Sequence, residues 1–197
     1  MNPALPKKQR EKRKGGLKKR KGWVKEFIFI VGGARSGKSR YAQALAKRIS
    51  KKVAFIATCT PQDKEMKKRI ALHQKARPRH WKVIEEPREI KSILPGLKEK
   101  FDVVIIDCLG LLISNFLSTG LNERAIEKEI TLIAGFLSKA KFTSIVVSNE
   151  VGGGIVPGNA LARRFRDLAG FSNQIMAKRA DRVIFMQSGI PMKIKGE

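Results

Sequence analysis

The chain has 197 residues, of which 42% are hydrophobic, and a formal net charge of +25. This length suits one α/β domain with a substantial core. No apolar run approaches the roughly 18 residues of a membrane-spanning helix, and no apolar segment of signal-peptide type follows the basic N-terminus. The two cysteines, Cys59 and Cys108, are too few for a disulfide framework, so we expect a reducing cytoplasm.

The first 25 residues carry much of the charge. They hold eleven Lys/Arg and one Glu, a net +10, which leaves +15 for the other 172 residues. Because this stretch has few apolar residues, we expect a disordered tail over 1–25 and one domain over 26–197. The tail can contact nucleic acid or another polyanion, or it can be a solvated extension. Trp23 is its only aromatic residue, which argues against base stacking, so nucleic acid is not an expected partner although the tail leaves it open.

The first predicted strand, 27–31, runs directly into a phosphate-binding loop pattern, and a predicted helix over 40–47 follows. Glycines let backbone N–H groups surround an anion, and the helix N-terminus adds its positive dipole. Lys38 can reach the β- and γ-phosphates of a nucleoside triphosphate, and the Ser39 hydroxyl can bind Mg²⁺. The loop therefore predicts nucleotide-binding residues at Gly32, Gly33, Ala34, Arg35, Ser36, Gly37, Lys38 and Ser39.

Another apolar strand, expected at 101–107, ends in the carboxylate of Asp107, which is the Walker-B pattern. In a parallel sheet this strand end faces the phosphate loop, so Asp107 is expected beside the Mg²⁺ that Ser39 holds. The alternative is that Asp107 only begins a loop or caps a helix.

The remaining pattern alternates strands with helices. Strands are expected at 52–59, 81–87, 143–150 and 181–186, with an edge segment at 191–195; helices are expected at 63–76, 88–99, 121–141 and 159–180, the last capped by Asn159. This order predicts a single-domain P-loop NTPase-like fold, a doubly wound, mostly parallel sheet with helices on both faces.

Several motifs together resemble a known family. In chain order they are the phosphate loop, Glu65-Met66-x-x-Arg69-Ile70-x-x-His73-x-x-x-Arg77-Pro78-x-x-Trp81, Glu85-Glu86-Pro87, Asp107-Cys108-Leu109 and Ser148-Asn149-Glu150-Val151-Gly152-x-Gly154-Ile155-Val156-Pro157. Over about residues 27–195 they closely resemble the bifunctional adenosylcobinamide kinase/adenosylcobinamide-phosphate guanylyltransferase family of cobalamin biosynthesis. The resemblance implies phosphorylation of adenosylcobinamide by ATP or GTP, and transfer of GMP from GTP to adenosylcobinamide phosphate.

The family's covalent guanylyl-histidine corresponds to His73. Neutral imidazole can accept a phosphoryl group near pH 7, and nearby basic residues would disfavour its protonation. Without the resemblance, His73 could equally be a packed helix residue. The resemblance also implies guanine-nucleotide contacts at Ala57, Thr58, Cys59, Gln74, Lys75, Ala76, Arg77, Glu85 and Asp107.

Further expectations concern the substrate side and the assembly. Asn149 and Glu150 are suggested to contact Mg²⁺ or the corrinoid, and Gly110 stands where a threonine-like residue is expected. The family resemblance also implies a homotrimer. Two alternatives stay open: a small-molecule kinase in which His73 is structural, and a polyanion-binding P-loop ATPase that uses the basic tail.

Overall fold

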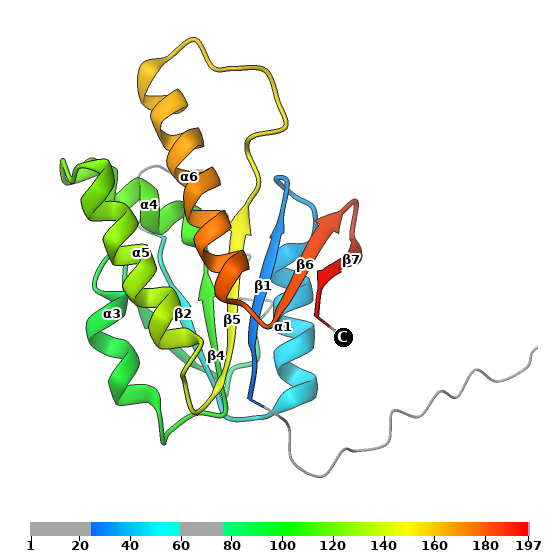
Figure 1. The fold of residues 1–197 in the computed structure, drawn as a ribbon. Coiled ribbons are helices and arrows are strands. Elements are labelled where there is room, and N and C mark those ends of the chain that lie inside the picture. The colour runs from blue at the N-terminus through cyan, green and yellow to red at the C-terminus, as the bar shows by residue number, and fades with distance from the viewer. Residues whose placement is uncertain (1–24, 60–76, 197) are drawn as a thin grey trace, which may run out of the picture.

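The computed structural model describes residues 25–59 and 77–196, which form one α/β domain around a seven-stranded sheet (Figure 1). The strands are β1 (Phe27–Gly32), β2 (Val53–Ala57), β3 (Lys82–Glu85), β4 (Val103–Asp107), β5 (Thr143–Asn149), β6 (Arg182–Gln187) and β7 (Ile190–Lys195). The helices are α1 (Lys38–Ile49), α3 (Ile90–Ile93), the 3-10 helix η1 (Leu94–Leu97), α4 (Leu109–Ser118), α5 (Glu123–Leu137) and α6 (Ala160–Arg179). The helix predicted over 63–76 lies outside the described residues.

The sheet has the strand order β3-β2-β4-β5-β1-β6-β7. All neighbouring strands run parallel except β7, which pairs antiparallel with β6 and forms one edge. The predicted α/β fold with a mostly parallel sheet is therefore confirmed. Parallel strands place all their carboxyl ends at one edge of the sheet, and β1 delivers the phosphate loop to that edge (Figure 1).

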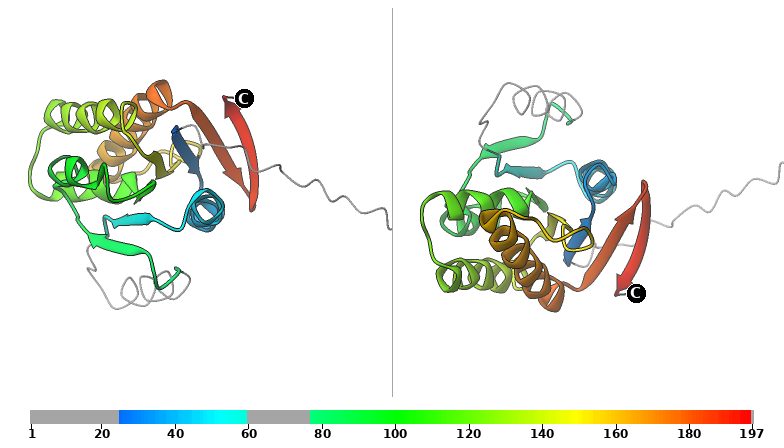
Figure 2. Two further views of the ribbon diagram at one scale, coloured as in Figure 1. Left: turned by 90° about the horizontal axis from the view of Figure 1, so that it is seen from below. Right: turned by 90° about the horizontal axis from the view of Figure 1, so that it is seen from above.

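Helices cover both faces of the sheet, with α1 on one face and α4, α5 and α6 on the other (Figure 2). Alternate residues of β1 serve the two cores: Phe27 and Phe29 pack on the side of α4–α6, and Ile28 and Ile30 pack on the side of α1. Burial on both faces explains why the strands read as unbroken apolar runs. Among the described residues, no helix is both long enough and apolar enough to cross a membrane.

The helix predicted over 88–99 is shorter and different in kind. The structure has four α-helical residues in α3, which pass directly into η1. Pro95 lacks the N–H that a continuing α-helix would use, so the segment tightens into a 3-10 turn. The buried side chains of this segment are Ile90, Leu94 and Leu97, with Ile93 partly buried against the core.

Candidate active site

The phosphate loop connects β1 to α1, and two of its glycines are required by the backbone. A Cβ on Gly32 would lie 2.4 Å from the carbonyl oxygen of Met186 in β6, so no side chain fits there. Gly37 precedes α1 with φ of 94°, in the left-handed region that glycine adopts at low cost. The sharp turn at Gly37 leaves the first backbone N–H groups of α1 facing the loop, where an anion can accept from them.

Lys38 lies across this loop. Its Nζ donates to the carbonyl oxygen of Gly33 at 2.6 Å and to Ser36 Oγ at 3.4 Å, and the residue is only 7% exposed. Burial lowers the pKa of Lys38, and the neighbouring Cys108 and Asp107 partly oppose that shift. The ammonium is therefore held inside the loop, within the electrostatic reach of the Asp107 carboxylate.

The strand register brings the two predicted carboxylates together. Ala57, the last residue of β2, pairs with Asp107 of β4 on one side and with Glu85 of β3 on the other. The three residues thus form a row across the carboxyl edge of the sheet. Asp107 is half-buried and Glu85 is exposed.

Arg77 provides a positive charge beside this row. Its guanidinium lies 3.8 Å from the centre of the Phe55 ring, a cation–π contact with a buried strand residue. Burial lowers the pKa of Arg77, whereas the Asp107 and Glu85 carboxylates raise it. Its buried Nε donates to no atom of the residues that the structure describes. This arrangement places a cation beside two carboxylates at the carboxyl edge of the sheet.

A buried set of hydrogen bonds fixes the ends of β2, β3 and β4. Thr58 Oγ1 donates to the carbonyl of Cys108 at 2.8 Å and accepts from the N–H of Cys108 at 2.8 Å. The side-chain amide of Asn115, on α4, donates to the carbonyls of Thr58 at 2.8 Å and Pro87 at 2.9 Å. These bonds hold the backbone on either side of Asp107 and beyond Glu85.

The match to known proteins covers nearly the whole described fold. The model of the family described as "Cobinamide kinase / cobinamide phosphate guanyltransferase" matches residues 28–194. The chain belongs to this family. The bifunctional adenosylcobalamin biosynthesis protein CobP of Pseudomonas aeruginosa is 41% identical over 169 residues, which cover 86% of this chain and 97% of that protein. The bifunctional adenosylcobalamin biosynthesis protein CobU of Salmonella typhimurium is 39% identical, over 86% of this chain and 99% of its own length.

Among solved structures, an ATPase domain superposes with a TM-score of 0.45 at 14% identity, covering 82% of this chain and 69% of that one. That likeness is distant. The P-loop NTPase-like fold of this family member is seen in its own topology, in which β1, the phosphate loop and α1 adjoin the Asp107 end of the sheet.

Several residues expected at the site of this cobinamide kinase family member lie where they can act together. Ser39 is half-buried in the first turn of α1, Ala34 and Arg35 are exposed in the loop, and Ser36 is buried. Asp107, Glu85 and Arg77 share the carboxyl edge of the sheet. His73, Gln74, Lys75 and Ala76 lie outside the described residues.

Thr58, Cys59 and Cys108 lie just beyond the ends of β2 and β4, and the nucleotide contacts expected at Thr58 and Cys59 stay predictions. The Thr58 hydroxyl is fully buried and both donates to and accepts from the backbone of Cys108, while Cys59 is half-buried. Burial raises the pKa of the Cys108 thiol to about 12, so it stays protonated and unreactive at neutral pH. Neither cysteine forms a disulfide.

The end of β5 adjoins the loop at its β1 side. The Glu150 N–H donates to the Gly32 carbonyl at 2.8 Å, and Glu150 Oε1 accepts from the Gly152 N–H at 2.7 Å. A Cβ at Gly110 would lie 3.8 Å from the Phe165 ring and 3.9 Å from Asn149 Nδ2, so a small side chain would fit there. Glycine at this position therefore leaves room beside Asn149.

The donors near the phosphate loop suit Mg²⁺. The Ser39 hydroxyl and the Asp107 carboxylate are hard oxygen ligands, which Mg²⁺ prefers, and it usually completes its shell with water and substrate phosphates. Within residues 25–59 and 77–196, no group of three or more His, Cys, Asp or Glu side chains forms a metal cage of its own.

Proposed function

We propose that this protein phosphorylates a cobinamide with ATP or GTP and then transfers GMP from GTP to the cobinamide phosphate. The observation that carries the proposal is the placement of Lys38 inside a phosphate loop that faces Asp107, in a chain that belongs to the cobinamide kinase / cobinamide phosphate guanyltransferase family. The proposed cobinamide substrates follow from the description of that family, and the similar curated proteins are described as bifunctional adenosylcobalamin biosynthesis proteins.

In the kinase step, the loop N–H groups and Lys38 would hold the β- and γ-phosphates. Lys38 would exchange its bond to the Gly33 carbonyl for phosphate oxygens. Ser39 and Asp107 would hold Mg²⁺, which when bound offsets the negative charge that the phosphates develop. The substrate hydroxyl attacks the γ-phosphorus, the bond from that phosphorus to the β-bridging oxygen breaks, and the nucleoside diphosphate leaves.

In the guanylyl step, His73 would attack the α-phosphorus of GTP. A nitrogen–phosphorus bond forms, the bond to the bridging oxygen breaks, and pyrophosphate leaves from the same loop. A phosphate oxygen of the cobinamide phosphate then attacks the α-phosphorus and releases His73, which gives a diphosphate link. We assign charge stabilisation on the α-phosphate to Arg77, whose guanidinium lies beside Asp107 and Glu85.

Glu85 is the proposed partner of the guanosine. Its exposed carboxylate, one strand away from Asp107, can accept from the guanine N1–H and amino group or from ribose hydroxyls. The two cysteines, both outside disulfides, agree with a cytoplasmic setting for this activity.

The test uses GTP labelled at the α-phosphorus. The wild type should acquire a covalent label that acid removes and alkali does not, because a phosphorus–nitrogen bond is labile to acid, and added cobinamide phosphate should chase it from the protein. The His73→Ala variant should acquire none while still phosphorylating cobinamide. If the His73→Ala variant still acquired the label, His73 would not be the nucleophile. If the wild type never acquired the label, the protein would be a kinase without guanylyltransferase activity.

A further inference from the structure

The edge of the sheet opposite the phosphate loop is lined with basic side chains. Four strands begin there side by side: the Lys52 carbonyl accepts from the Asp102 N–H at 3.0 Å, the Asp102 carbonyl from Thr143 at 2.9 Å, and the Glu26 carbonyl from Ser144 at 2.9 Å. The exposed cations on and next to these strand starts, named here the basic edge, are Lys25, Lys47, Arg48, Lys51, Lys52, Lys98, Lys100, Lys139 and Lys141.

Few acidic groups neutralise the basic edge. Glu26 is paired with Arg182 at 2.7 Å. The other acidic side chains at this edge are Asp102, Glu99 between two of the lysines, and Asp181, which accepts from the Phe27 N–H at 2.7 Å. The ion pairs between described residues involve none of the nine cations. Lys98 Nζ lies 4.9 Å from the centre of the Phe136 ring. Nine cations against three carboxylates leave this end of the domain with a net positive charge, which favours an anionic partner.

The chemistry of the edge indicates what kind of anion it fits. Eight of the nine cations are lysines, whose compact charge does not require the two-pronged geometry with which arginine recognises single phosphates. None of the nine is accompanied by an exposed aromatic side chain, among the described residues, on which a base could stack. Neighbouring strands are about 4.8 Å apart, so the four strand starts extend over roughly 15 Å along one edge. A broad row of lysines without stacking aromatic residues suits the head groups of a phospholipid layer better than the groove of a nucleic acid.

We propose that the basic edge binds the anionic surface of a phospholipid membrane. With this edge on the lipid, the strands run away from the membrane and the phosphate loop lies at the far end of β1, open to nucleotide (Figure 1). The chain before Lys25 is itself strongly basic in sequence, so the charge at this end continues beyond the domain. The binding is peripheral and electrostatic, and it is independent of the catalytic assignment.

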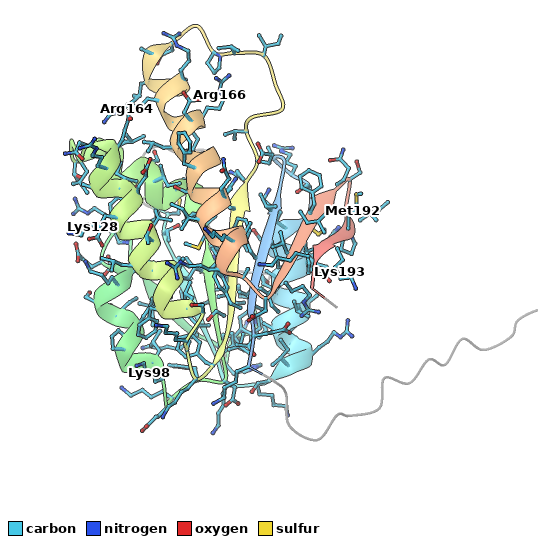
Figure 3. All side chains as sticks on the ribbon, viewed as in Figure 1. Lys98, Lys128, Arg164, Arg166, Met192 and Lys193 are labelled. Atoms are coloured by element: carbon cyan, nitrogen blue, oxygen red, sulfur yellow. The ribbon has the colours of Figure 1, made fainter. Side chains whose placement is uncertain are left out.

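The test uses the full-length protein in sedimentation with vesicles of phosphatidylcholine, alone or mixed with phosphatidylglycerol. The edge variant is Lys100→Gln/Lys139→Gln/Lys141→Gln. The matched control is Arg124→Gln/Lys128→Gln/Lys193→Gln, which removes three exposed charges elsewhere. Lys98, which is part of the basic edge, lies at the lower end of the molecule, whereas Lys128 and Lys193 project from α5 and β7 (Figure 3).

Wild type should sediment with the anionic vesicles and not with the neutral ones, and it should dissociate as the salt concentration rises. Each lysine near the lipid contributes roughly fivefold in affinity, so the edge variant should bind roughly a hundredfold more weakly than wild type. The control should bind with close to wild-type affinity. Both should keep wild-type nucleotide turnover. Equal losses in the two variants would overturn the proposal, and so would tighter binding to duplex RNA than to anionic vesicles with the same edge dependence.

Discussion

Thr58 and Cys108 are joined by a reciprocal pair of hydrogen bonds between the ends of β2 and β4. The Thr58 hydroxyl donates to the Cys108 carbonyl and accepts from the Cys108 N–H, both at 2.8 Å. Cys108 directly follows Asp107, so this pair determines where the Asp107 backbone leaves the sheet. The catalytic proposal for Asp107 therefore depends on a threonine that no solvent reaches.

Replacing Thr58 by valine keeps the shape of the side chain and removes both bonds. The Cys108 N–H would be left buried without its acceptor, which costs about 1–3 kcal/mol, whereas the Cys108 carbonyl would still accept from the Leu112 N–H at 3.2 Å. We expect the free energy of unfolding in urea to fall by that amount, and the KM for nucleotide to rise. Thr58→Ser, which keeps the hydroxyl, should stay close to wild type; a Thr58→Val protein as stable as wild type would contradict the argument.

Asn115 is expected to position the carboxylate row from α4. Its amide donates to the Thr58 and Pro87 carbonyls, next to the ends of β2 and β3. In Asn115→Leu both carbonyls lose their donor, and we expect the KM for nucleotide to rise several-fold at a temperature where the variant is still folded. Ser118→Ala, on the same helix, removes only a local bond to the Asn115 carbonyl and serves as the control. Equal KM values in the two variants would assign Asn115 a purely structural role.

Helix α4 shows what the sequence could not reveal. The segment Leu109–Ser118 is apolar on most sides, so it lacks the one-sided period that marks an amphipathic helix. Its N-cap, Cys108, makes no side-chain capping bond. Without a predicted helix there, Asn115 has no place in the sequence-based site, although its amide connects the segments that follow β2 and β3.

Features that depend on residues close together in the sequence could be predicted from the sequence. The phosphate loop is evident because glycines, lysine and serine occur at fixed spacing between a strand and a helix, and the predicted cap Asn159 accepts from the Ala162 N–H at 3.1 Å. The strand order is not predicted, because pairing such as Ala57 between Asp107 and Glu85 arises from packing across the sheet. Arg77 is expected near nucleotide, but its contact with Phe55 is visible only in three dimensions.

The close approach of Gly32 to β6 gives a prediction about stability. In Gly32→Ala the new Cβ would lie 2.4 Å from the Met186 carbonyl oxygen, so backbone must shift. Overpacking of this kind costs about 1–3 kcal/mol, which should appear as a lower free energy of unfolding. Gly33→Ala is the matched control, because no heavy atom of the described residues lies within 4 Å of its Cβ position. Similar stability losses in both variants would mean that β6 is not the obstacle.

The Cys108 thiol predicts a pH dependence of stability. Burial raises its pKa to about 12 from the ordinary 9.0. The folded state therefore binds this proton more tightly than the unfolded state does, so the contribution is fully present below about pH 9 and is lost as pH rises towards the folded pKa. Cys108→Ala lacks the titrating group. Between about pH 8 and pH 11, the free energy of unfolding in urea should therefore fall more for wild type than for Cys108→Ala. A difference that is constant over this range would show that burial does not perturb the thiol.

Substituting Lys38 tests whether the phosphate loop serves both proposed reactions, whereas substituting His73 tests only guanylyl transfer. Its ammonium lies inside the loop at 2.6 Å from the Gly33 carbonyl, where it would meet the phosphates in both proposed reactions. Lys38→Met removes the charge while keeping most of the volume, and losing one such electrostatic contact typically costs roughly 10²–10³ in rate. We expect kinase and guanylyl transfer to fall together by that factor, whereas His73→Ala should lose guanylyl transfer alone. Lys47→Met makes the same change at an exposed position on the same helix and should leave both rates unchanged. If Lys38→Met impaired only one reaction, the two steps would not share one phosphate site.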